Sequence, residues 1–262
     1  MSLEAHLRER RDSGSPLLVP YITAGITDDW LDYARAYAEA GADAIEVGLP
    51  FSDPMLDGPA VQLASQRALD HGMTPAAALD QIAGLSIGVP LIAMTYSNVV
   101  LRPGREEFGR RLVSSGCEGL IVVDTPHDEV GPLSLAVGQH GLDLVMMVAP
   151  STGPARMKQI CALSRGFIYA ASVMAPTGER SDLAESALGV ASHVRSFTTL
   201  PVLLGFGIAT AAAAVEACRH ADGIVVGSAL IRRILDGESP TQVAQYVQTL
   251  RAAMDGFASS RN

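Results

Sequence analysis

Residues 17–49 read LLVPYITAGITDDWLDYARAYAEAGADAIEVGL and contain a complete strand–helix–strand unit. The runs LLVPYIT (17–23) and AIEVGL (44–49) are continuously apolar apart from single polar positions, without the alternation of a half-exposed strand. Such runs are typical of parallel strands that are covered on both faces. Between them, DDWLDYARAYAEAGAD (28–43) predicts a helix that closes near a glycine. The stretch therefore predicts parallel sheet with a helical crossover.

The same pattern recurs along the rest of the chain. Six further strands are expected at 89–95, 119–123, 143–149, 167–171, 201–205 and 223–226, and five further helices at 103–116, 128–141, 152–166, 183–197 and 209–222. Eight strand–helix units in 262 residues average about 33 residues each, close to the size of a βαβ repeat. This count predicts an α/β fold of the (β/α)8 TIM-barrel type, formed as a single domain over residues 1–262. A doubly wound open sheet is the alternative, although it usually has fewer strands.

Two terminal segments complete the expected barrel. LEAHLRER (3–10) predicts a short extra helix that caps the bottom of the barrel, and PTQVAQYVQTLRAAMDGF (240–257) predicts the eighth outer helix. No linker, low-complexity stretch or charge block divides the chain.

Composition narrows the functional class. The formal net charge of −9 argues against a general nucleic-acid binder, which needs a basic face, and against adhesion to an anionic membrane. Cys117, Cys161 and Cys218 form no CxxC pair or His/Cys cluster, so neither a metal site nor a disulfide framework is expected. The N-terminus has no apolar signal region, and no apolar run approaches the roughly 18 residues of a membrane span. A cytoplasmic location is expected.

Active sites of such barrels lie at the C-terminal ends of the strands, where the sequence places several carboxylates. Glu46 falls inside an otherwise apolar strand and is followed by Asp53 and Asp57 in a loop rich in Gly and Pro. A glutamate that points into the barrel is desolvated, which raises its pKa toward neutrality and suits it to proton transfer. The alternative is that Glu46 points outward and pairs with a helix residue.

Glycine turns follow two neighbouring strands. Gly205 and Gly207 lie in LLGFGIAT, and Gly227 and Ser228 lie in VVGSAL, where Ser228 is expected to cap the next helix. These loops form the recurring phosphate site of the fold, because backbone N–H groups can approach an anion closely there. A tight turn explains a single glycine pair equally well, but two on adjacent strands favour a phosphate cradle.

Other polar groups are expected near the strand ends. Tyr169 lies in the strand at 167–171, and the polar segment after it has the character of a lid, with an exposed loop as the alternative. Asp124 and the pair Tyr96 and Asn98 follow two other strands.

The stretch AIEVGLPFSDPMLDGPAVQ (44–62) closely resembles the signature of the tryptophan synthase alpha chain family. The resemblance continues in order through PYITAG, MTYSN, VVDTP, GFIYAAS, GFGI and VGSAL, and covers essentially the whole chain. It implies a (β/α)8 barrel that is a lyase of tryptophan biosynthesis. Such an enzyme cleaves indole-3-glycerol phosphate to indole and glyceraldehyde 3-phosphate. It also implies a β-subunit partner in an αββα heterotetramer, with pyridoxal phosphate in the partner and no cofactor in this chain.

The resemblance also implies roles for individual residues. Glu46 resembles the general acid/base, and Asp57 resembles the carboxylate that accepts the indole N–H. The matches to the family's substrate and phosphate contacts are Tyr169, Gly178, Gly207, Gly227 and Ser228. Asp53 and Pro54 match loop residues that face the β subunit, and Thr177 matches the lid threonine that contacts the position of Asp57.

One departure from the family pattern lies in the lid. Ala175 and Pro176 stand where the family usually has Gly-Val, and Pro176 restricts Ala175 to extended geometry. Two alternative functions follow from this change. One is a specialised paralogue that releases indole without a partner, and the other is a catalytically weak subunit that binds ligand and activates a partner. Another phosphosugar barrel, such as an isomerase or epimerase, is disfavoured by the PFSDPxxDGP loop.

Overall fold

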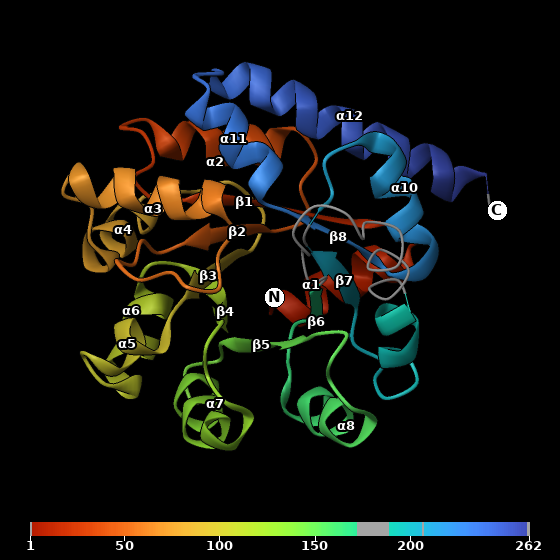
Figure 1. The fold of residues 1–262 in the computed structure, drawn as a ribbon, viewed down its shortest axis with the longest axis horizontal. Helices are drawn as coiled ribbons and strands as arrows, with labels where there is room; N and C mark the ends of the chain where they lie inside the picture. The colour runs from red at the N-terminus through yellow and green to blue at the C-terminus, as the bar shows by residue number, and fades with distance from the viewer. Residues whose placement is uncertain (1, 172–188, 206, 261–262) are drawn as a thin grey trace.

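Eight parallel strands form a closed barrel in which each strand pairs with its neighbours in the chain and β8 pairs with β1 (Figure 1). The computed structural model describes residues 2–171, 189–205 and 207–260. The strands are β1 Leu17–Thr23, β2 Ile45–Gly48, β3 Leu91–Thr95, β4 Cys117–Val122, β5 Asp143–Val148, β6 Ile168–Ala171, β7 Val202–Gly205 and β8 Gly223–Val226. All eight overlap the predicted ranges, and closure of the ring excludes the open sheet.

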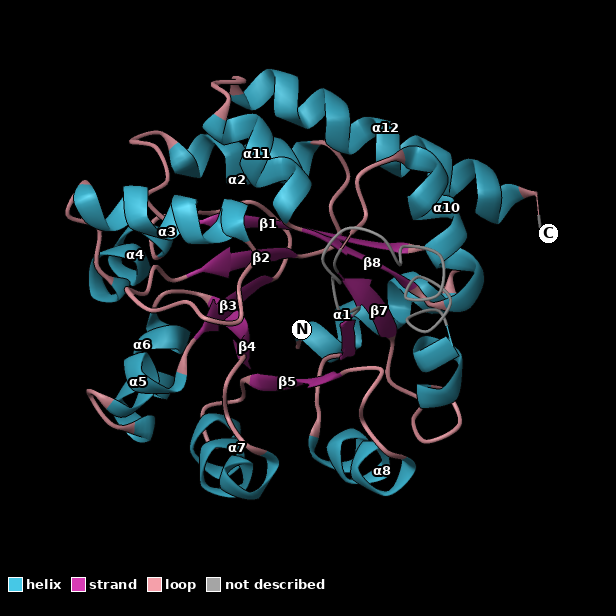
Figure 2. Cartoon of the chain, in the orientation of Figure 1, coloured by secondary structure: helices cyan, strands magenta, loops and turns pink. Residues whose placement is uncertain are grey.

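Helices surround the barrel on its outside (Figure 2). They are α2 Trp30–Glu39, α3 Pro59–Asp70, α4 Pro75–Ile82, α5 Ser97–Leu101, α6 Arg105–Ser114, α7 Val130–Gly138, α8 Pro154–Leu163, α10 Ala211–His220, α11 Ser228–Leu235 and α12 Pro240–Ser259, with a 3-10 turn at His127–Glu129. The predicted helices at 28–43, 103–116, 128–141, 152–166 and 209–222 are confirmed, as is the terminal helix at 240–257. Residues 189–194 of the helix predicted at 183–197 are helical, and 183–188 lie outside the described residues.

Three helices of the described ranges are absent from the sequence prediction. After β2 the chain forms α3 and α4, and after β3 it forms the short α5. Both α3 and α4 begin at a proline, which lacks the N–H that the first turn of a helix leaves unpaired. The start of α3 is not evident from the sequence, because the loop before it is rich in Gly and Pro and proline is also a turn signal. None of the helices in the described ranges is long and apolar enough to cross a lipid bilayer.

The predicted N-terminal helix, α1 (Leu3–Asp12), closes the bottom of the barrel. Leu3 and Leu7 are fully buried among the side chains that fill the barrel interior. Leu3 lies so close to β4 that a Cβ added at Gly119 would be 2.6 Å from its Cδ2 atom. The N–H of Glu4 donates to Asp143 Oδ2 at the start of β5, at 2.7 Å. α1 therefore closes the N-terminal end of the barrel interior.

A buried ionic cluster ties the two ends of the chain to the barrel. The carboxylate of Asp43, just before β2, accepts hydrogen bonds from the Leu18 N–H at 2.8 Å, from Arg10 Nε at 2.7 Å and from Arg251 Nη1 at 3.1 Å. Asp43 and Arg251 are buried, whereas the Arg10 side chain is 43% exposed. One carboxylate therefore connects α1, β1 and α12.

Replacement of Asp43 with Asn should lower the free energy of unfolding by about 2 kcal/mol, because Arg251 would lose its buried carboxylate partner and keep only the half-exposed Asp255. Urea denaturation followed by circular dichroism measures this loss. The matched variant Arg10→Gln removes the partly exposed partner of Asp43 and leaves the buried Arg251 in place. It should lower the free energy of unfolding by less than about 1 kcal/mol. Equal losses in the two variants would contradict the assignment of Asp43 and Arg251 as the buried pair.

Candidate active site

Glu46 points into the barrel interior. Side chains two residues apart in a strand share a face, and Ala44 belongs to the cluster that fills the barrel. Glu46 is 1% exposed, and its Oε2 atom contacts no hydrogen-bond donor within the described residues. Burial first, and the charge of Asp57 second, raise the pKa of Glu46 from its ordinary value of 4.5 to about 8. The outward orientation of Glu46 is therefore excluded, and this carboxyl carries a proton at neutral pH.

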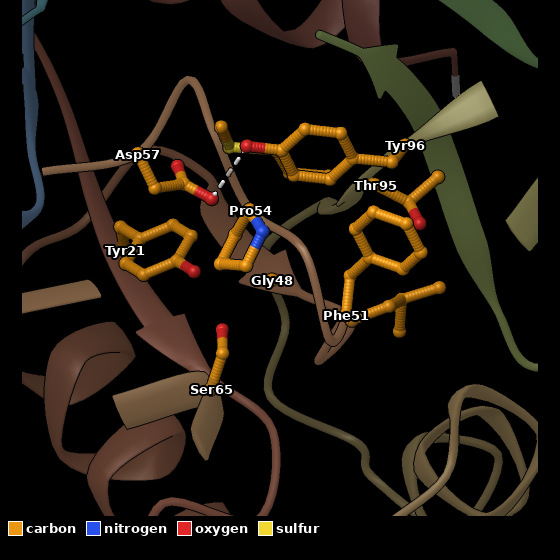
Figure 3. Close-up of a pocket in the computed structure, with 10 residues that line it drawn as sticks. Tyr21, Gly48, Phe51, Pro54, Asp57, Ser65, Thr95 and Tyr96 are labelled. Carbon is orange, nitrogen blue, oxygen red and sulfur yellow. Dashed lines mark hydrogen bonds between the residues drawn. The ribbon is translucent and has the colours of Figure 1, made fainter. Parts of the chain in front are cut away.

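Asp57 lies in the loop between β2 and α3, beside the C-terminal ends of β2 and β3. Its Oδ2 atom accepts a hydrogen bond from the Tyr96 hydroxyl at 3.0 Å (Figure 3). Burial raises the pKa of Asp57 from 3.8 to about 6, against the Tyr96 hydrogen bond, which lowers it. At pH 7 Asp57 is therefore ionised, and its charge contributes to keeping Glu46 protonated.

A cavity opens beside Asp57, and Figure 3 shows the side chains around it. Its walls come from β1, β2, β3, α3 and the loop after β2, and they include Tyr21, Phe51, Pro54, Ser65, Met94 and Tyr96. The lining combines aromatic and aliphatic side chains with hydroxyl groups and the carboxylate of Asp57, which can accept a hydrogen bond from a ligand.

The loop that carries Asp57 is held from α3. Gln62 donates through Nε2 to the backbone oxygen of Asp57 at 2.9 Å and to that of Pro54 at 3.4 Å. Asp53 is exposed on the outer side of this loop and accepts the Ser52 hydroxyl hydrogen bond at 2.6 Å. The loop therefore presents Asp57 inward and Asp53 outward.

Tyr21 on β1 and Tyr169 on β6 lie inside the top of the barrel, each against a glycine. A Cβ added at Gly48 would be 2.0 Å from the hydroxyl oxygen of Tyr21, and one added at Gly205 would be 2.3 Å from that of Tyr169. Burial, then the charges of Glu46 and Asp57, raise the pKa of the Tyr169 phenol. The structure thus brings the predicted residue Tyr169 together with both carboxylates.

Glycine turns follow β7 and β8 as predicted. Gly207 adopts a φ of +78°, which favours glycine, and precedes α10. The expectation that Ser228 caps the next helix is wrong, because Gly227 is the N-cap of α11 and Ser228 is its first residue. The Ser228 hydroxyl is therefore not engaged in capping. A Cβ added at Gly58 would be 3.8 Å from Ser228 Oγ, so this turn lies beside the loop of Asp57.

Four predicted residues, Ala175, Pro176, Thr177 and Gly178, lie outside the described residues. Asp124, noted at the end of β4, instead braces the turn after β3, since its Oδ1 accepts from the Ser97 N–H at 2.6 Å and from the Ser97 hydroxyl at 2.9 Å. In the part of the chain that the structure describes, no group of His, Cys, Asp and Glu is arranged to hold a metal ion.

The sequence does not identify Tyr21 as a site residue. It indicates Tyr96 as a polar group near a strand end but not its hydrogen bond to Asp57. Tyr21 lies in the C-terminal half of a predicted strand and Tyr96 directly follows one, which is the available signal. The contact between Tyr96 and Asp57 joins residues 39 positions apart, so no local pattern indicates it.

Known families and structures resemble this chain closely. The family model described as "Tryptophan synthase alpha chain" matches residues 7–259. A tryptophan synthase alpha chain from Gloeobacter violaceus is 40% identical, over 95% of this chain and 92% of that protein. One from Carboxydothermus hydrogenoformans is 41% identical, over 86% of each.

Solved structures agree with these relatives. The tryptophan synthase alpha subunit of Legionella pneumophila superposes with a TM-score of 0.87 at 29% identity, over 98% of this chain and 99% of that one. A chain of Mycobacterium tuberculosis tryptophan synthase superposes with a TM-score of 0.87 at 35% identity, over 96% and 97%. Family, relatives and fold thus agree along nearly the whole length. The chain belongs to the tryptophan synthase alpha chain family, the lyases that cleave indole-3-glycerol phosphate to indole and glyceraldehyde 3-phosphate.

Proposed function

We propose that this chain catalyses the alpha reaction of its family with Glu46 as general acid/base and Asp57 as the acceptor of the indole N–H. The observation that carries this assignment is the pair of carboxyl groups at one end of the barrel, the buried Glu46 with a pKa of about 8 and the half-buried Asp57 with a pKa of about 6. Two carboxyl groups whose environments separate their pKa values can divide acid and base tasks at one pH.

Glu46 has the protonation state that the first step needs. In a retro-aldol cleavage, the protonated Glu46 donates its proton to C3 of the indole. The resulting Glu46 carboxylate then takes the proton of the side-chain hydroxyl. The hydroxyl oxygen forms the aldehyde as the C–C bond breaks, and the electron pair returns to the ring. Glu46 ends protonated as it began, so one side chain serves both transfers.

Asp57 is ionised at the pH at which Glu46 is protonated. Protonation of C3 places positive charge on the ring and its N–H. An ionised carboxylate that accepts this N–H stabilises the charge as it develops, in a site shielded from water. Tyr169 and the cavity walls would contact the indole ring.

The phosphate of the substrate would lie at the turns after β7 and β8. We assign Gly207, Gly227 and Ser228 to this site, together with Gly178 from outside the described residues. Ser228 begins α11, whose N-terminal N–H groups carry partial positive charge. Such local charge is independent of the net charge of −9.

The outer side of the Asp57 loop would contact a β subunit. Asp53 is exposed, and beside it Met55 and Leu56 are 79% and 54% exposed. Exposed apolar side chains of this size mark interaction surfaces when they are contiguous. We propose that Asp53 and Pro54 face the partner in an αββα heterotetramer in the cytoplasm, as one domain over residues 1–262. The family's alpha chain has no cofactor, and pyridoxal phosphate belongs to the β subunit.

Purified protein should release indole from indole-3-glycerol phosphate. Since the reaction needs Asp57 ionised and Glu46 protonated, kcat/KM should follow a bell-shaped pH profile with limbs near pH 6 and pH 8. A colorimetric indole assay, with and without a β subunit, measures both. Absence of indole under both conditions would refute the assigned activity, and indole release that a β subunit leaves unchanged would favour the free-standing paralogue.

A further inference from the structure

The hydroxyl of Tyr96 sits between two groups of the Asp57 loop. It accepts a hydrogen bond from the Leu56 N–H at 3.1 Å and lies 3.0 Å from Asp57 Oδ2. Figure 3 shows the carboxylate of Asp57 facing this hydroxyl across the top of the cavity. Tyr96 thus engages both the backbone and the side chain of the loop.

The amide determines the direction of both hydrogen bonds. A backbone N–H can only donate, so the oxygen of Tyr96 accepts from Leu56. The single hydroxyl hydrogen is left for Asp57, and Oδ2 receives it. The other oxygen of the Asp57 carboxylate, Oδ1, takes no part in this bond, and Asp57 lines the cavity.

The backbone of Tyr96 belongs to the barrel, whereas its ring and hydroxyl contact the loop after β2. Tyr96 follows β3 directly, is 4% exposed, and its ring stacks on Phe51 with centroids 4.9 Å apart and planes 26° apart. The phenol therefore has little freedom to rotate away. A hydrogen bond from such a fixed group sets the position of a loop carboxylate relative to the strands.

We propose that Tyr96 is a positioning residue that holds Asp57 by Oδ2 and turns Oδ1 toward the N–H donor of the bound indole ring. This inference rests on the role assigned to Asp57 under the proposed function. Gln62 provides the contrast, because it holds the same loop through the backbone oxygens of Pro54 and Asp57, whereas Tyr96 holds the carboxylate itself.

The hydrogen bond also favours the charged form of Asp57. Among the described residues, the charge of Asp57 raises the pKa values of Glu46, Tyr21, Tyr169 and Tyr96, and the charge of Asp124 also raises that of Tyr96. Of these contacts, the Tyr96 hydrogen bond lowers the pKa of Asp57, while burial raises it. Removal of the hydroxyl should therefore raise this pKa above its value of about 6.

The test is Tyr96→Phe, which keeps the ring and its stacking on Phe51 and removes only the hydroxyl. The acid limb of the kcat/KM profile should move upward by about one pH unit, because a hydrogen bond to a carboxylate stabilises the charge by roughly this amount. At pH 6.5, kcat should fall about tenfold, from the smaller ionised fraction of Asp57 together with its lost orientation. The alkaline limb set by Glu46 should change less. The matched control Gln62→Ala should leave the acid limb at its wild-type position.

A second readout is independent of turnover. The Asp57 carboxyl carbon is followed by ¹³C NMR titration in aspartate-labelled protein and assigned by its loss in Asp57→Asn, with circular dichroism to verify the fold of each variant. Its pKa should rise in Tyr96→Phe and not in Gln62→Ala. An unchanged Asp57 titration in Tyr96→Phe overturns the inference, whether or not the protein makes indole. Absence of indole from wild-type protein refutes the proposed function instead, so the two failures are distinguishable.

Discussion

Replacement of Glu46 with Gln should lower kcat for indole release by about 10³-fold or more, within the range that general acid–base catalysis contributes. Glutamine has the shape of a protonated glutamate but neither gives up a proton to carbon nor accepts one from a hydroxyl. Glu46 is 1% exposed within the barrel, so bulk water cannot readily take over its role in proton transfer. Binding should persist, because the proposed phosphate contacts follow β7 and β8 and do not involve β2.

Steady-state kinetics and calorimetric titration with a substrate analogue separate these two effects. Glu118→Gln is the matched control: it removes a half-buried strand glutamate, but Glu118 lies near His6 and Asp143 at the closed end of the barrel. That variant should retain wild-type kcat. A Glu46→Gln enzyme that keeps more than about a tenth of wild-type kcat would exclude Glu46 as the acid/base.

The same substitution should stabilise the protein at alkaline pH. The native state holds the Glu46 proton up to a pKa of about 8, whereas an unfolded chain releases it near 4.5. The native state therefore binds more protons between these values, and wild-type stability falls as pH rises through this window. At about 1.4 kcal/mol per pH unit, the loss reaches about 5 kcal/mol at pH 9. The amide of the Glu46→Gln variant does not titrate, so the variant avoids this loss.

Urea denaturation at pH 5 and pH 9 tests this expectation. Wild type and Glu46→Gln should agree within about 1 kcal/mol at pH 5 and differ by several kcal/mol at pH 9. Glu107→Gln is the control, because its pKa shift has the opposite sign: hydrogen bonds from Arg111 and Arg110 lower the pKa of Glu107. Its replacement should therefore not stabilise the protein at pH 9. Identical pH dependence of wild type and Glu46→Gln would mean that Glu46 is not buried as a neutral acid. The expected result would show that the site is maintained at a cost in stability.

The strands are predictable because a parallel strand covered on both faces requires a continuous apolar run, which each segment displays locally. β1 coincides with its predicted range, and β8 does as well. The closed ring follows from the number of strands. α3 and α4 are less predictable, since the proline that begins each helix is also one of the strongest turn signals.

Some residues of the candidate site can likewise be identified from the sequence, and others cannot. Glu46 is identifiable from the sequence because a carboxylate in an apolar strand is unusual at any level of structure. The capping role expected of Ser228 is wrong because the helix already begins at Ser228, so that the N-cap position lies one residue earlier, at Gly227. The relation of Asp57 to Tyr96 depends on the approach of a loop to a neighbouring strand, which no local pattern records.

The sequence by itself therefore determined the barrel and the candidacy of the two carboxylates near the C-terminal end of β2, because strand burial and helix periodicity follow from the order of neighbouring residues. Only the tertiary structure decided that Glu46 faces inward without a hydrogen-bond partner at Oε2 among the described residues, and that Tyr96 holds one oxygen of Asp57. Protonation states depend on what surrounds a carboxyl group in space. Those surroundings here come from β1, β3, β6 and the loop after β2, which become neighbours only when the barrel closes.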